Sequence, residues 1–223
     1  MNKSFIYLTA AVAGLALASC GSNATEAGAA DSTLSATEGS ATYTVSSEST
    51  LGWKGTKVVG MGSHAGTIGI SEGTISLENG NITAGSVTID MNKIVVTDSG
   101  MTDETKQKLI GHFSSDDFFN VEQFPTAKFE ITGSEAKAEG DYTHVISGNL
   151  TLRDSTKNIS FPATVAVDEN GVSAVGTAVF NRLDWGVNYD KEKMSLTEKL
   201  QATAKNGIVS KDIEVTFNIK ATK

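Results

Sequence analysis

The 223-residue sequence contains a single cysteine, Cys20, so no disulfide can form within the chain. Basic residues are also scarce: 18 lysines and arginines stand against 26 aspartates and glutamates, which gives a formal charge of −8. This balance repels phosphate backbones and argues against a nucleic-acid partner. With 39% hydrophobic and 20% charged residues, the chain still has the composition of a folded globular protein.

The usual machinery of catalysis is also missing. The sequence has no Gly-x-Ser-x-Gly nucleophile elbow and no phosphate-binding glycine loop. Its three histidines, His64, His112 and His144, are far apart and lack the short spacings of zinc sites. We therefore expect no metal, no other cofactor and no enzyme activity. An enzyme acting on a bound amphiphile would need these histidines to converge near a carboxylate.

Residues 1–19 are typical of an export signal. Lys3 provides the basic start, and an apolar stretch from Phe5 to about Ala18 is shorter than the roughly 20 residues that span a bilayer. The sequence Leu17-Ala18-Ser19-Cys20 resembles the lipobox of bacterial lipoproteins. The resemblance implies that Cys20 becomes an acylated N-terminus, and several acyl chains anchor a protein stably. The alternative is an ordinary signal peptide with an incidental cysteine.

We accordingly expect an exported protein, lipid-anchored to the bacterial cell envelope, with its domain in the periplasm or at the cell surface. Gly21 does not supply the acidic retention signal of some lipoproteins, which favours the outer membrane over the inner one. Residues 20–41 are mostly glycine, serine, alanine and threonine, and this composition predicts a flexible tether. The folded domain is expected to comprise residues 42–223.

From residue 42 onward, apolar residues alternate with polar ones, as in strands with one buried face. The clearest runs are 43–45, 51–55, 68–70, 75–77, 87–91, 144–152, 159–167, 172–180 and 213–219. Glu72-Gly73, Asn79-Gly80 and Asn170-Gly171 predict tight turns between them. Connections this short cannot hold crossover helices, so we expect antiparallel strands and exclude a doubly wound α/β fold.

About eight such strands must close into a barrel or stack as two sheets, and periodicity does not separate the two. Glycines inside strands, such as Gly148 and Gly176, favour strong coiling or close backbone approach. Short helices are expected at 102–110, with Gly111 as a left-handed cap, and at about 196–205. The expected fold class is all-β: an antiparallel barrel of about eight strands with one or two short helices.

The stretch from His112 to Phe129 follows neither a helix period nor a strand period. It reads HFSSDDFFNVEQFPTAKF and resembles the H-L-x-S-x-D-F-F and Y-P-x-x-x-F signature of YceI-like proteins, the lipid- or polyisoprenoid-binding family. Phe113 replaces the family's commoner leucine. Further matches to family motifs, in the expected order, are Trp53-Lys54-Gly55, His64-Ala65-Gly66, Gly148-Asn149-Leu150-Thr151-Leu152-Arg153 and Asn181-Arg182-Leu183-Asp184-Trp185-Gly186.

The resemblance implies an extended, lipocalin-like barrel that holds a long isoprenoid or similar amphiphilic lipid in an apolar interior, without turnover, for transport or sequestration. The candidate ligand-binding residues are Trp53, His64, His112, Phe118, Phe119, Phe129, Arg153, Phe180, Arg182 and Trp185. The alternative function is that of a structural or adhesion lipoprotein whose filled barrel acts through protein partners.

Each candidate also has a purely structural interpretation. The aromatic side chains either form core or line the mouth of an apolar cavity. Arg153 and Arg182 either meet an anionic head group through their guanidinium forks or pair with Asp154 and Asp184.

His112 is expected to tie the loop after the helix to the barrel. Neighbouring acids in an extended segment point apart, so Asp116 and Asp117 are expected to make turns rather than to catalyse.

Overall fold

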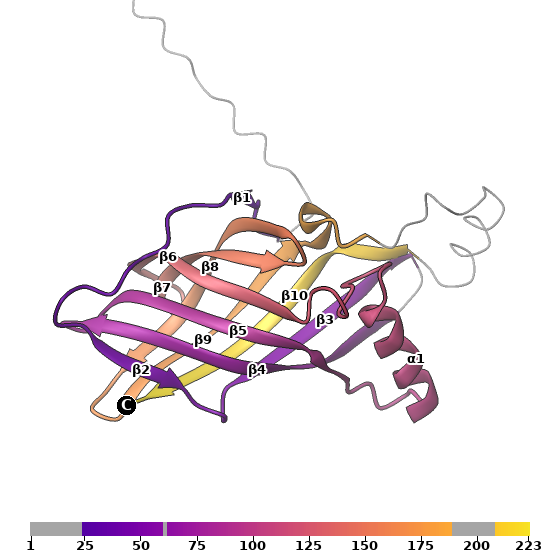
Figure 1. The fold of residues 1–223 in the computed structure, drawn as a ribbon, viewed down its shortest axis with the longest axis horizontal. Coiled ribbons are helices and arrows are strands. Elements are labelled where there is room, and N and C mark those ends of the chain that lie inside the picture. The colour runs from indigo at the N-terminus through magenta and orange to yellow at the C-terminus, as the bar shows by residue number, and fades with distance from the viewer. Residues whose placement is uncertain (1–23, 60–61, 189–207) are drawn as a thin grey trace, which may run out of the picture.

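The structure, a computed structural model, describes residues 24–59, 62–188 and 208–223. Eight antiparallel strands form a closed ring in which each strand pairs with the next along the chain and the last pairs with the first (Figure 1). They are β3 (Thr50–Val59), β4 (Ser63–Glu78), β5 (Asn81–Val96), β6 (Thr126–Glu139), β7 (Tyr142–Leu152), β8 (Ser155–Val167), β9 (Gly171–Asn181) and β10 (Ile208–Thr222). The predicted all-β barrel of about eight strands is confirmed.

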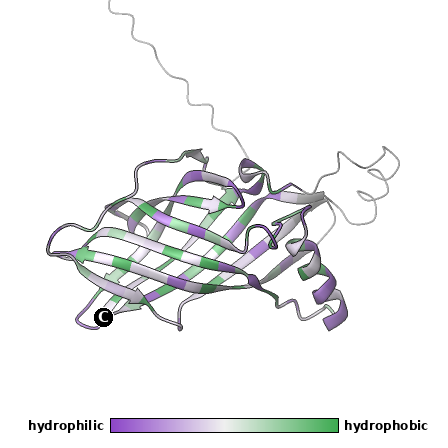
Figure 2. Ribbon diagram, in the orientation of Figure 1, coloured by the Kyte–Doolittle hydropathy of each residue, from purple (hydrophilic) through white to green (hydrophobic). Residues whose placement is uncertain are grey.

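Alternation of residue type along the strands separates the two faces of the barrel wall. Hydrophobic and hydrophilic residues succeed one another along each strand (Figure 2). On β10, Val215, Phe217 and Ile219 join the apolar interior, whereas Thr216 and Asn218 between them are exposed. Because successive side chains of a strand point to opposite faces, the period-two pattern alone places the core inside the ring.

The two ends of the barrel differ. Helix α1 (Asp103–Ser114) and the 3-10 turn η1 (Arg182–Trp185) lie at the end that we call the helix end (Figure 1). The opposite end, called the far end, carries the C terminus and the turn between β4 and β5. Asn79 and Gly80 adopt left-handed conformations in that turn, as their sequence predicts.

Helix α1 begins where the sequence predicts and ends later. The hydroxyl of Thr102 caps it by accepting a hydrogen bond from the Thr105 amide. Gly111 lies inside the helix rather than at a left-handed cap. The helix ends at Ser114, and the amide of its C-cap residue, Ser115, donates to the carbonyls of Gly111 and His112. The second expected helix, 196–205, lies outside the described residues. Within the described residues, no helix has the length and apolar character needed to cross a membrane.

The turn predicted at Glu72-Gly73 is wrong, because β4 continues through it. The pairing with β5 shifts register between Ile70 and Glu72, and the strand then runs on to Glu78. A Cβ at position 73 would lie 2.7 Å from Val45 Cγ2 and 2.9 Å from the Ser86 carbonyl oxygen. Glycine is needed there for close packing of neighbouring strands rather than for a reversal of the chain.

Residues 24–40, which we call the N-terminal strap, run across the outside of the barrel (Figure 1). The short strand β1 (Gly28–Ala29) pairs with the start of β8, and the Thr25 amide donates to the Val179 carbonyl of β9. At this level β8 and β9 no longer pair with each other. Farther along, the Leu34 amide donates to the Ile131 carbonyl at 2.8 Å, beyond the paired part of β5 and β6. The strap therefore bridges two places where the wall strands diverge.

A polar seat on the outer face of β7 holds the strap. The Asn149 side chain donates to the Asp31 carbonyl at 2.7 Å and accepts from the Asp31 amide at 3.0 Å. Asn158 also donates to the Asn149 side-chain oxygen. Asn149 is only 5% exposed because the strap covers it. This arrangement differs from the flexible tether expected for these residues, because amino-acid composition does not reveal which backbone groups will be hydrogen-bonded.

After the strap, β2 (Ala41–Val45) lies between the same two strands as β3, but closer to the far end. It pairs with β4 and β10 beyond the limits of β3. The signal segment 1–19 and Cys20 lie outside the described residues.

Candidate functional site

Helix α1 and the turns after it bring a cluster of aromatic rings to the helix end. The ring centroids are 5.2 Å apart for Trp53 and Phe113, 5.3 Å for Phe113 and Phe118, and 4.8 Å for Phe118 and Phe119. The His112 ring lies 5.7 Å from that of Phe118. Two of these pairs, Trp53 with Phe113 and Phe118 with Phe119, have the edge-to-face geometry that aromatic quadrupoles favour. We call these five residues the aromatic cluster.

Backbone hydrogen bonds shape the segment that delivers these rings. The Phe119 amide donates to the Phe113 carbonyl, and the amides of Phe118 and Asn120 both donate to the Ser115 carbonyl. Asn120 adopts a left-handed conformation with φ of 48°. Residues 116–119 form turns, as expected for the two adjacent aspartates. The stretch lacks a helix or strand period because much of it forms a compact series of turns.

The turn η1 closes the core from the side of β9. Trp185 is 1% exposed, and its indole N–H donates to the Leu150 carbonyl at 2.8 Å. Its ring lies 5.1 Å from Phe180, edge to face. The side chain of Asn181 caps η1, and Gly186 ends it in a left-handed conformation. Both rings belong to the buried core.

Arg182 is buried in this core. It is 8% exposed, and its guanidinium carbon lies 5.6 Å from the centre of the Phe118 ring. Nη1 donates to the Val187 carbonyl at 2.6 Å and Nε donates to the Ser210 carbonyl at 3.4 Å. Burial lowers the pKa of Arg182 from its usual value. The alternative interpretation, a pair with Asp184, is not what the structure has, because Asp184 accepts from Asn181 instead.

Arg153 converges on the same place from the turn between β7 and β8. Its Nη1 donates to the Phe118 carbonyl at 3.2 Å and to the Gly186 carbonyl at 3.4 Å. Its guanidinium also lies 5.9 Å from the Phe124 ring centre. Among the described residues no ion pair involves either arginine, so the alternative pair of Arg153 with Asp154 is not formed either.

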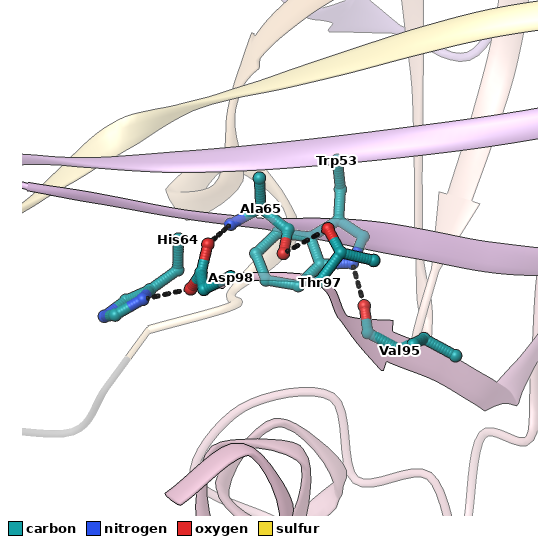
Figure 3. A network of polar contacts seen from close by, with 6 residues as sticks. All are labelled: Trp53, His64, Ala65, Val95, Thr97 and Asp98. Atoms are coloured by element: carbon teal, nitrogen blue, oxygen red, sulfur yellow. Dashed lines mark hydrogen bonds and ion pairs between the residues drawn. The ribbon is translucent and has the colours of Figure 1, made fainter. Parts of the chain in front are cut away.

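His64 lies at the helix end, where it forms a clip between two strands (Figure 3). Its Nδ1 lies 2.7 Å from Asp98 Oδ2, while Asp98 Oδ1 accepts from the Ala65 amide at 3.1 Å. Beside it, the Trp53 indole donates to the Val95 carbonyl at 3.2 Å. The bonds of His64 and Ala65 to Asp98 fasten the start of β4 to the chain leaving β5, and the Trp53 bond joins β3 to β5.

The three histidines have different contacts. His64 meets a carboxylate, but the ring of His112 packs in the aromatic cluster and that of His144 bonds to the Thr143 hydroxyl on β7. In the part of the chain that the structure describes, no three His, Cys, Asp or Glu side chains gather in a group that would hold a metal ion.

Phe129 lies apart from the other candidate aromatics, deeper in the barrel. Its ring is 5.5 Å from that of Phe161, which is 5.2 Å from that of Phe217. Glycines make room for this row: a Cβ at Gly148 would lie 2.1 Å from Phe129 Cζ, and one at Gly176 would lie 2.6 Å from Phe217 Cζ. In-strand glycine was thus a usable sequence signal, whereas nothing in the sequence marked Val187 or the pairing of rings.

Comparison with known proteins decides the family. The model of the YceI-like domain matches residues 43–221. The chain belongs to the YceI-like family. A UPF0312 protein of Shewanella denitrificans is 34% identical over 125 residues, which cover 53% of this chain and 61% of that relative. The aligned part of this YceI-like chain therefore spans about six-tenths of the relative's length.

Solved structures share the YceI-like fold. A polyisoprenoid binding domain from Saccharophagus degradans, implicated in plant cell wall breakdown, has a TM-score of 0.57 at 15% identity, with 81% of this chain and 97% of that one covered. BcnA of Burkholderia cenocepacia has a TM-score of 0.54 at 17% identity, with 78% and 97% covered. Both neighbours are matched over 97% of their length, so nearly the whole of each has the same barrel fold as this chain.

Proposed function

We propose that this YceI-like protein binds a polyisoprenoid or similar amphiphilic lipid inside its barrel, without catalysis, for transport or sequestration at the cell envelope. One observation carries the proposal: the buried apolar side chains form two groups, one towards the helix end and one towards the far end, and these two halves of the interior meet at side chains that are not fully buried. The side chains that contact both halves are all only partly buried, and they are Ile68, Ile82, Ile89, Val165 and Phe217.

Partial exposure at these positions has a simple geometric meaning. Ile68, Ile89 and Phe217 lie on strands that are hydrogen-bonded on both sides at that level. The wall is closed around them, which favours partial exposure towards the interior rather than through the wall. A space lined by aliphatic and aromatic groups suits the hydrocarbon chain of a lipid. The Saccharophagus domain of the same fold, described as polyisoprenoid-binding, supports this ligand class.

The proposal includes export and a lipid anchor at Cys20, as the lipobox resemblance implies, with the outer membrane favoured. It is tested by metabolic labelling with palmitate, which should be incorporated into the protein and lost on Cys20→Ser. Label that persists in the variant, or none in the parent, would remove the anchor from the proposal.

A structural or adhesion role remains the second candidate, because one observation favours it. The phenylalanines Phe129, Phe161 and Phe217 form a continuous row of contacting rings inside the barrel. If these rings close the interior, no long chain can pass, and the function would lie in protein partners.

Two neighbouring positions on β9 separate the candidates. Ala174 faces the interior and is partly buried, whereas Val175 is 46% exposed on the outer face. In full-length protein, displacement of a fluorescent fatty-chain probe by a long-chain isoprenoid alcohol should weaken about tenfold or more in Ala174→Phe and stay unchanged in Val175→Phe. Urea unfolding of both variants controls for damage to the fold. Equal binding by the two variants, or no binding by the parent, would favour the filled barrel.

A further inference from the structure

The helix end concentrates the arginine of this protein. Of its 18 basic residues only two are arginines, Arg153 and Arg182. They come from turns 29 positions apart, yet both contact Phe118, one through the ring and the other through the carbonyl oxygen. They also donate to consecutive carbonyls, those of Gly186 and Val187. The fold therefore brings two guanidinium groups to one place.

Neither of these two cations is paired with a carboxylate of the described residues. Their hydrogen-bond acceptors there are backbone carbonyls, and neither arginine takes part in an ion pair. Arg182 is 8% exposed and yet stays protonated, as arginine does throughout the physiological range. A buried charge without a counter-charge is costly, and an anion placed beside it recovers that cost.

Donors for such an anion are in place. The Nε of Arg153 is buried and has no hydrogen-bond partner. The bonds of Arg182 to described residues use Nε and Nη1, which leaves the N–H groups of Nη2 for another acceptor. Arg153 also holds a left-handed conformation, with φ of 55°, at a turn position where glycine or asparagine would fit more easily. The chain thus keeps an arginine where local backbone preference disfavours one.

We propose that Arg153 and Arg182 together bind the oxyanion end group, phosphate or carboxylate, of an amphiphile whose apolar chain lies in the barrel. The inference rests on the proposed lipid-binding function and adds the chemistry of the polar end. Phe118 connects the two parts, since its ring belongs to the apolar core and lies against the Arg182 guanidinium. Guanidinium forks match oxyanions with paired N–H···O bonds, so the site selects a charged end group over a neutral one.

The test compares farnesyl phosphate, farnesol and inorganic phosphate on full-length protein by calorimetric titration. The parent should bind farnesyl phosphate about 10- to 100-fold more tightly than farnesol, as expected for hydrogen bonds to a charged group. Arg153→Met and Arg182→Lys should lose most of this preference and keep the affinity for farnesol, which shows that the barrel is intact. Lys211→Met, which removes an exposed charge on β10 near the same end, should change neither affinity.

Equal affinity of the parent for farnesyl phosphate and farnesol would overturn the proposal, as would a preference that survives both arginine variants. Inorganic phosphate that binds as tightly as farnesyl phosphate would keep the anion site but overturn its assignment to a lipid. Phosphate binding without any uptake of farnesol would instead refute the proposed function and leave the anion site standing. If Arg182→Lys does not fold, Arg153→Met decides, because Arg153 as a whole residue is only half-buried in the turn between β7 and β8, whereas Arg182 is 8% exposed.

Discussion

The N-terminal strap should contribute measurably to the stability of the barrel, and Asn149→Ala tests this. The substitution removes three hydrogen bonds: the donation to the Asp31 carbonyl, the acceptance from the Asp31 amide and the acceptance from Asn158. At about 1 kcal/mol each, with further loss from groups left buried and unpaired, the free energy of unfolding should fall by about 2–4 kcal/mol. For a domain of this size the melting temperature should fall by about 5–12 °C.

Urea unfolding gives the free energy, and amide hydrogen exchange locates the effect. The Asp31 amide should lose protection, and the Leu34 amide should lose it too if the strap detaches as one unit, since Leu34 donates to Ile131 rather than to Asn149. Asn218→Ala, at an exposed position on the outer face of β10, is the matched control and should cost less than about 0.5 kcal/mol. If Asn149→Ala is as mild as this control and Asp31 exchange is unchanged, the strap is not held by this seat.

Two further substitutions test the interior. Gly148→Ala places a Cβ 2.1 Å from Phe129 Cζ and should lower the free energy of unfolding by about 1–3 kcal/mol. The control is Gly133→Ala, whose Cβ meets its nearest neighbour at an ordinary 3.6 Å and should have a mild effect. Equal urea midpoints for the two variants would contradict the packing described. Trp185→Phe removes the indole hydrogen bond to the Leu150 carbonyl and part of a ring that is 1% exposed. Thermal unfolding should therefore show that the free energy of unfolding falls by about 2–4 kcal/mol. An unchanged melting temperature would exclude the structural role of η1.

Alternation predicted the antiparallel strands because every strand has an inner and an outer face, whereas the prediction of a barrel rather than a sandwich depended on the glycines within strands and on the family resemblance. Alternation at positions such as Val215, Phe217 and Ile219 records that geometry directly. The turn signal at Glu72-Gly73 was misleading, because a glycine that relieves crowding between strands looks the same in sequence as a glycine in a turn. Gly111 was misread in a similar way: glycine is the usual residue at a helix C-terminal cap, but here it lies inside the helix.

Features that depend on tertiary contacts were less predictable. The strap lacks large apolar residues, and it is held by backbone amides and by Asn149, which composition alone cannot identify. Arg153 and Arg182 were both recognised as candidates, but their convergence around Phe118 depends on two separate turns meeting at one end of the barrel. Spacing along the chain carries no information about such a meeting.

The central claim, that the barrel holds an amphiphilic lipid, is tested most directly by native mass spectrometry of full-length protein extracted from membranes of the cells that produce it. We predict a species heavier than the processed protein by the mass of one long-chain amphiphile, released on unfolding and replaced by added isoprenoid. Protein that is repeatedly empty, and that takes up no added isoprenoid, would contradict the claim and favour a filled barrel that acts through protein partners.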